Sequence, residues 1–281
     1  MGIVFGAVVL VLAAPGRDAH STSTVFSAAV GGCYLLAGVI AAVRQPGNRV
    51  GLLLVLAGIG WFAEDLYVSI DPLVHTVGLP IRSASAAFLL HLVLAFPRGG
   101  VRSRVDRVLV AIGYVAVFGL VPLSTLSLHT HTPNLLLIRP VSWTQAVIDT
   151  VQMVVGAALV VVLVVRWITA TKPARRVLAP VAVAGLLGSV QSVAGPVLGE
   201  HIDWLYRVVS GVGHAAVLLL PVAFLAGVWR VRLGRSTVTH LLARMPRSSP
   251  AQLQELLARA LGDPSLRVGY YRRGQDDYVD L

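Results

Sequence analysis

Long apolar stretches separated by short polar loops occupy the first 228 residues of the chain. A helix needs roughly 20 mostly apolar residues to cross a hydrocarbon core about 30 Å thick. Seven stretches reach or approach that length, the third only if it begins near Leu79. They cover residues 25–43, 50–69, 83–96, 108–126, 146–165, 177–198 and 208–228. The pattern predicts an all-α polytopic membrane helix bundle.

An eighth apolar stretch, residues 2–14, leaves the number of spans open. Its length is that of a signal-peptide apolar region, but no basic residue precedes it. If it crosses the membrane, the bundle has eight transmembrane helices; if it does not, the count is seven.

The basic residues predict how the bundle is oriented. All but four of the 23 Lys and Arg residues fall in alternate loops and in the segment after residue 228; the exceptions are Arg17, Arg82, Arg139 and Arg207. Cytoplasmic loops of membrane proteins carry such an excess of basic residues. We therefore expect a multi-pass protein of the plasma (inner) membrane with a cytoplasmic C-terminus.

Composition supports a bilayer protein and narrows the function classes. Hydrophobic residues make up 56% of the chain and charged residues 13%, against about 25% charged in soluble domains. The net charge of +10 is accounted for by the basic loops, and no aromatic residues interleave with them as in nucleic-acid-binding segments. A single cysteine, Cys33, excludes an intrachain disulfide and a cysteine metal cluster. We expect neither a nucleic-acid partner nor a metal or other cofactor.

The segment after the last span is expected to be cytoplasmic. Residues 229–245 are predicted to form a connecting helix, because the apolar residues Val231, Val238 and Met245 recur every seven positions. Two interpretations remain open for it. It either lies on the membrane or extends the last span, or it is a signalling helix through which the protein forms a homodimer.

Residues 246–281 predict the start of a small α/β domain. Residues 251–261 form an amphipathic helical pattern, and residues 266–271 and 277–281 read as two short strands of a hairpin. One helix and one hairpin bury too little surface to be stable alone. We therefore expect a truncated domain, or a tail that docks on a partner, after a sensor bundle at 1–228 and a connecting helix at 229–245.

Three stretches together resemble actinobacterial two-component sensor histidine kinases. Residues 44–51, RQPGNRVG, resemble the R-x-P-G-N-R-x-G loop between two of their membrane spans. Residues 96–104, beginning FPRGG, resemble their next cytoplasmic loop. Residues 256–266, LLARALGDPSL, followed by Tyr270, Tyr271 and Tyr278, are similar to the segment before their dimerisation helices.

The resemblance implies a signal-input module that relays to a cytoplasmic output. In that family the phosphoacceptor histidine and the ATP-binding motifs lie downstream of the segment matched here, so no catalytic residue carries over. His240, the histidine of the connecting helix, has no adjacent carboxylate to act as a base. We do not expect this chain to be an active kinase alone, and we expect a separate kinase half or a response regulator as its partner.

Four polar residues inside the predicted spans are candidate ligand-sensing residues. Counted at about 1.5 Å per residue from the nearest cytoplasmic arginine, they all lie roughly 21 to 24 Å deep. They are Glu64, Gln152, Gln191 and His214, with Asp65 and Asp149 slightly nearer the outer surface.

Two interpretations of this polar level stay open. The residues line a sensing pocket open to the outside, or each makes one interhelical hydrogen bond or reaches the interface. The same residues give the alternative function, a small-molecule or ion transporter or channel. Three other histidines favour structural explanations: His91 as a packed histidine, and His129 and His131 in a solvated loop.

Overall fold

The computed structural model describes most of the apolar region and a few residues of the tail. It covers residues 2–13, 21–96, 99–101, 103–139, 141, 143–198, 204–205, 207–209, 211–225, 254–255, 258, 267, 269–272 and 277–279. The predicted connecting helix at 229–245 and most of the predicted domain at 246–281 lie outside this set.

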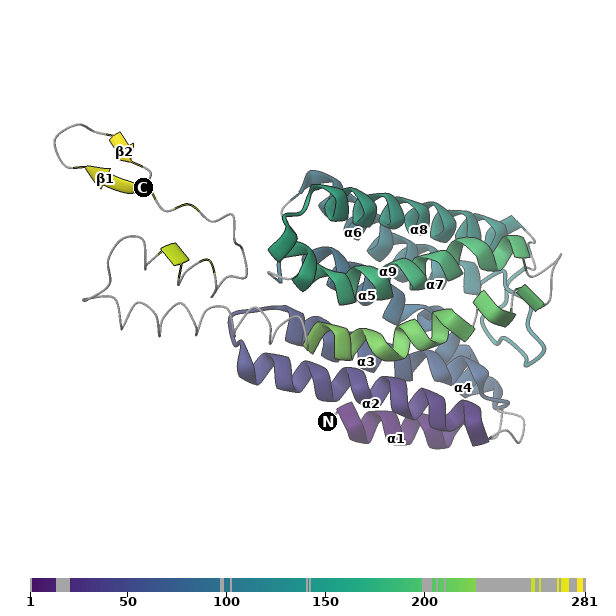
Figure 1. Cartoon of the computed structure of the whole chain (residues 1–281). Helices are drawn as coiled ribbons and strands as arrows, with labels where there is room; N and C mark the ends of the chain where they lie inside the picture. The colour runs from purple at the N-terminus through teal and green to yellow at the C-terminus, as the bar shows by residue number, and fades with distance from the viewer. Residues whose placement is uncertain are drawn as a thin grey trace.

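The described residues form a bundle of helices whose axes run roughly side by side (Figure 1). The bundle begins with α1 (Gly2–Ala13), α2 (Ser21–Arg44) and α3 (Val50–Glu64). The following elements are the 3-10 helix η2 (Asp65–Val68), α4 (Pro72–Gly78), the 3-10 helix η3 (Leu79–Ile81), α5 (Ala84–Ala95), α6 (Arg104–Val115), the π-helix η4 (Ala116–Leu120), α7 (Val121–Thr125), α8 (Trp143–Thr169) and α9 (Lys172–Leu198). A further helix, Arg207–Leu225, which we call the distal helix, follows α9.

Within the described chain, six helical segments are long and apolar enough to cross a membrane. They are Val25–Arg44, Val50–Val68, Pro72–Ala95, Arg104–Thr125, Trp143–Thr169 and Arg207–Leu225. The described part of α9 contains a shorter apolar segment, Leu178–Ser189, and α1 has 12 residues, or about 18 Å of helix. The polytopic helical bundle is therefore confirmed, whereas the count of seven or eight spans stays a prediction.

Prolines lie where the third and fourth spans depart from a regular α-helix. The third begins at Pro72, not residue 83, because α4 and η3 continue the apolar segment before α5, with Pro80 in the 3-10 turn between them. The fourth contains a π-helical turn, η4, directly before Pro122. Proline lacks an amide N–H and its ring collides with the carbonyl four residues earlier, which breaks the regular α-helical pattern.

Glycines let α2 and α3 pack closely as an antiparallel pair. A Cβ on Gly38 would lie 2.7 Å from Val55 Cγ2 and 2.9 Å from the Gly51 carbonyl oxygen. Nearer the start of α2, a Cβ on Gly58 of α3 would lie 3.1 Å from the Gly31 carbonyl oxygen. Such small-residue contacts are the usual basis of tight helix packing in membranes, where no hydrophobic effect drives helices together.

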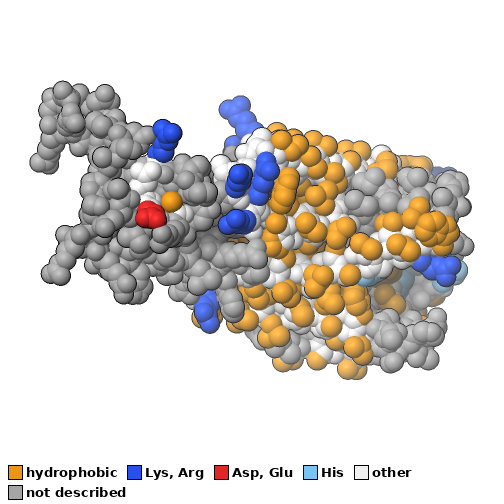
Figure 2. Space-filling model, viewed as in Figure 1, with side chains coloured by type: hydrophobic (Ala, Val, Ile, Leu, Met, Phe, Trp, Pro, Cys, Tyr) orange, Lys and Arg blue, Asp and Glu red, His pale blue; other side chains and the backbone are white. Residues whose placement is uncertain are grey.

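The outside of the bundle is apolar around its middle. Exposed large side chains include Leu36, Val39, Leu52, Val108 and Val161, from four different helices. Figure 2 shows a wide belt of hydrophobic side chains with Lys and Arg at its ends, more of them at the left-hand end. A soluble monomer rarely exposes so continuous an apolar surface. The belt and the six long apolar helices fit a multi-pass membrane protein.

Three helix-to-helix turns meet at one end, which we call the basic end. It contains the turns α2–α3, α5–α6 and α8–α9, and with them Arg44, Arg49, Arg104, Arg107, Arg166, Lys172, Arg175 and Arg176. Contacts between the turns, described below, bring them together. The separation of basic from apolar surface agrees with the positive-inside pattern.

In the tail, β1 (Tyr270–Arg272) pairs antiparallel with β2 (Asp277–Val279), with Tyr271 opposite Tyr278. β2 falls within the predicted range 277–281, whereas β1 overlaps the predicted range 266–271 and extends one residue beyond it, to Arg272. The small α/β domain to which they were assigned stays a prediction.

The helix packing predicts that two glycine substitutions on α2 differ in their effect on stability. We expect Gly38→Ala to lower the free energy of unfolding by about 1–3 kcal/mol, because the added methyl overlaps α3. Gly32→Ala is the matched control, since its Cβ would meet nothing within 4 Å. Thermal unfolding in detergent measures both, and equal stability of the two variants would contradict the close contact.

Candidate functional site

Glu64, the last residue of α3, bonds to the start of another helix. Its Oε1 accepts a hydrogen bond from the Ser85 backbone N–H at 2.6 Å. Ser85 lies in the first turn of α5, where backbone N–H groups have no partner within the helix. Ser83, at the N-cap position, makes no capping bond with its side chain. Glu64 therefore caps α5 from the neighbouring span.

His214 and Asp65 belong to a cluster between α2, the end of α3 and the distal helix. The Ser27 hydroxyl donates to Asp65 Oδ2 at 2.5 Å and accepts from Trp61 Nε1 at 3.0 Å. The Phe26 ring packs edge-on against both Trp61, at 6.4 Å between ring centroids, and His214, at 5.4 Å. The distal helix thus meets the α2–α3 pair through an aromatic contact.

A second polar group lies between η3, α7 and α8. Arg82 donates to Ser124 Oγ at 3.1 Å and to Gln145 Oε1 at 3.3 Å. Gln145 in turn donates to Asp149 Oδ1 at 2.9 Å. Gln152 lies one turn further along α8 and is half-buried. Arg82 was predicted only as a loop charge, but here it links three elements.

The contacts sort the predicted sensing residues into two groups on different helices. Glu64 and His214 lie with the α2–α3 pair and its neighbours, whereas Gln152 shares α8 with the Arg82 group. Gln191 lies in α9, and its side chain is outside the described part of the structure. A single sensing pocket lined by all four residues stays a prediction.

A buried histidine that the sequence did not single out fastens α4 to the loop after α7. His75 is 5% exposed, and its Nδ1 lies within hydrogen-bond distance of the Tyr67 carbonyl oxygen. Its Nε2 lies 3.0 Å from Thr130 Oγ1. Next to it, Thr76 Oγ1 accepts from the Leu135 N–H at 3.1 Å. The non-basic end of the bundle is therefore closed by side-chain bonds.

The three other histidines lie as their predicted structural roles require. His91 packs edge-on against the Tyr114 ring, with Nδ1 3.2 Å from the Tyr114 hydroxyl oxygen. His129 and His131 are exposed in the loop between α7 and α8. Among the described residues, no group of three or more His, Cys, Asp and Glu is placed to hold a metal ion.

At the basic end, Arg166 joins α8 to both α5 and α6. Its NH2 group donates to Asp106 Oδ2 at 2.6 Å, and both of its terminal nitrogens donate to the Leu94 carbonyl oxygen, at 3.0 and 3.1 Å. Leu94 lies in the last turn of α5, where carbonyl groups lack partners within the helix. Arg166 thus neutralises the buried Asp106 and caps α5 at once.

The loops at residues 44–51 and 96–104 touch each other. Gly99 adopts a φ of +75°, a conformation that favours glycine. A Cβ there would lie 1.9 Å from Asn48 Oδ1 and 2.8 Å from the Arg49 backbone nitrogen, so only glycine fits. Asn48 is itself fixed by a hydrogen bond to Gln45 and by accepting from the Val50 N–H.

The distal helix reaches the same end. The Phe224 ring is fully buried and packs edge-on against Phe96, with 5.0 Å between centroids. Phe96 is the first residue of the FPRGG loop. Two turns earlier in the same helix, the Val217 carbonyl oxygen accepts a hydrogen bond from the Tyr34 hydroxyl at 3.0 Å. One helix therefore contacts both the Trp61 cluster, through His214, and the motif-bearing loop, through Phe224.

Comparison of the chain with protein-family models, with curated proteins and with solved structures finds no match.

The ion pair between Arg166 and Asp106 predicts that removing one charge at the basic end lowers the stability of the fold. We expect Asp106→Asn to lower the free energy of unfolding by about 2 kcal/mol, because Arg166 loses its charged partner while its side chain is only 28% exposed. Arg107→Gln, an exposed change on the next residue, is the control and should stay within about 0.5 kcal/mol of the unsubstituted protein. Thermal unfolding in detergent measures both variants. Equal losses of stability in the two would show that the ion pair does not stabilise the fold.

The cap on α5 predicts that charge at Glu64 matters less than its oxygen. Glu64→Gln keeps an acceptor for the Ser85 N–H and should leave stability nearly unchanged. Glu64→Ala removes the acceptor and should cost about 1–2 kcal/mol, as at other helix caps. The same unfolding assay tests this, and a Gln variant as unstable as the Ala variant would contradict the capping role.

Proposed function

We propose that this protein is a membrane-embedded signal-input module, resembling the N-terminal half of a two-component sensor histidine kinase, that relays a signal to a cytoplasmic output. The observation that carries the proposal is the contact between Phe224 and Phe96. It joins the helix that leads into the tail to one of the two loops with family-like motifs, and Gly99 joins that loop to the other.

The distal helix supplies a route for the signal. His214 contacts the Phe26–Trp61 cluster, and Phe224 lies ten residues later, about 15 Å along the helix axis. A ligand or membrane state that moves the helix at His214 also moves it at Phe224, because a helix shifts as a rigid element. In this mechanism Glu64, Gln152, Gln191 and His214 are sensing residues, and the shift passes to the predicted connecting helix at 229–245.

The proposal includes an orientation and partners. The protein lies in the plasma membrane with its basic end on the cytoplasmic side, as the positive-inside rule requires, and its C-terminus is on that side too. The output is a separate kinase half or a response regulator, and the connecting helix forms a homodimer.

A phosphorylation assay tests the function. The tagged full chain is cross-linked in cells that naturally make it, purified, and incubated with radiolabelled ATP. We expect a co-purifying polypeptide to take up acid-labile, alkali-stable label, the behaviour of phosphohistidine. Phe224→Leu should change the label at least fivefold at equal amounts of purified protein, because it weakens the contact with Phe96. Phe118→Leu is the control, since Phe118 packs against Phe88 and Tyr114, away from the distal helix.

The assay also distinguishes the signal-input function from the alternative, a transporter or channel. Absence of such label in every purified fraction would count against the proposal. Uptake of solute by proteoliposomes that Glu64→Gln abolishes would then favour a transporter or channel, because that variant keeps the cap on α5 and removes only the charge.

A further inference from the structure

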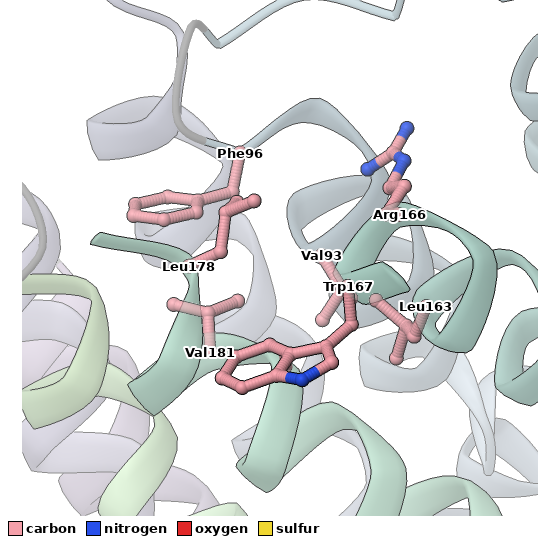
Figure 3. A pocket seen from close by; sticks show the side chains of 8 residues that line it. Val93, Phe96, Leu163, Arg166, Trp167, Leu178 and Val181 are labelled. Atoms are coloured by element: carbon pink, nitrogen blue, oxygen red, sulfur yellow. The ribbon is translucent and has the colours of Figure 1, made fainter. Parts of the chain in front are cut away.

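An apolar cleft opens at the basic end between the end of α5, the end of α8 and the start of α9. Figure 3 shows its lining, which includes Val93, Phe96, Leu163, Trp167, Leu178 and Val181. The cleft is a shallow surface groove: the roughly 290 Å³ of empty space around its lining includes open space outside it, and its enclosed part is about the size of one water molecule. It lies at the basic end, next to Arg166, where the positive-inside pattern leads us to expect a membrane interface.

The charged member of this lining is Arg166, at one edge of the cleft (Figure 3). A guanidinium carries five N–H donors. Three hydrogen bonds go to Leu94 and Asp106, and no acceptor among the described residues takes the Nε–H or the second NH1 hydrogen. The side chain is 28% exposed, so these donors have a path to a ligand.

The turn between α8 and α9, which joins two of the helices that line the cleft, carries further positive charge. Lys172 and Arg176 are exposed there, and Arg175 closes the turn by donating to the Ile168 and Ala170 carbonyl oxygens. No Asp or Glu occurs in the sequence between Asp149 and Glu200. The N-terminus of α9, with its positive dipole end, begins at Lys172.

Apolar walls under a cationic rim match one kind of molecule. A soluble anion gains nothing from the apolar walls, and an apolar peptide gains nothing from the cations. A lipid with an anionic headgroup uses both, and basic pockets between helices on the cytoplasmic side bind such headgroups. We propose that this cleft is a binding site for an anionic phospholipid, whose acyl chain lies along Trp167 and Leu178 and whose phosphate is held by Arg166, Lys172 and Arg176. The proposal is independent of the function proposed above.

Native mass spectrometry of the purified full chain tests the site with two lipids of equal chain length, phosphatidylglycerol and phosphatidylcholine. We expect one phosphatidylglycerol to be retained with an affinity at least about fivefold above that of phosphatidylcholine. Lys172→Gln/Arg176→Gln should erase that preference while leaving the Arg166–Asp106 pair intact. Arg44→Gln/Arg104→Gln, which removes the same charge from other turns of the basic end, is the control and should keep it.

A second pair of variants tests the apolar wall. Ala182 lines the cleft, and Ala182→Leu should weaken lipid retention by narrowing it. Val183→Leu is the matched control, since Val183 is 53% exposed on the next position of the same helix. Three outcomes would overturn the proposal: equal retention of both lipids, equal loss in the two double-Gln variants, or displacement of the lipid by water-soluble glycerol phosphate at similar concentrations.

Discussion

Helix ends inside an apolar medium leave backbone groups that only the protein can satisfy, and this constraint organises the bundle. Ser85 at the start of α5 finds its acceptor in Glu64, and Leu94 at the other end of α5 finds its donor in Arg166. Because an unbonded backbone group costs several kcal/mol in hydrocarbon, each of these ionisable side chains has a structural task before it has any other.

The constraint changes how intramembrane polar residues are interpreted. Glu64 stands at a depth where a charged residue is usually taken as functional. Its bond to the Ser85 N–H gives it a capping role, and signalling or transport at that position has to operate together with the cap. His214 differs, because its neighbour is the Phe26 ring and it lies on the distal helix that continues toward the tail.

Close packing explains how separate loops become one surface. The glycines between α2 and α3 allow those helices to approach, and Gly99 allows the α5–α6 loop to rest on the α2–α3 turn. Phe224 then packs on Phe96 beside them. In the proposed mechanism, movement of the distal helix would reach the loops through these two contacts, because Phe224 is fully buried and Gly99 has no room for added atoms.

The sequence by itself determined the helical class, the approximate position of the spans and the gathering of basic residues in alternate loops, because these depend on hydrophobicity and charge along the chain. It also indicated the short hairpin of the tail. Only the tertiary structure decided where the third span begins, which glycines pack, and which partners the polar residues take. Equal depth along separate helices does not determine which faces meet. Glu64, Gln152 and His214 share a predicted level, yet in the structure Glu64 bonds to a backbone amide and His214 lies against an aromatic ring, whereas Gln152 shares α8 with the Arg82 group.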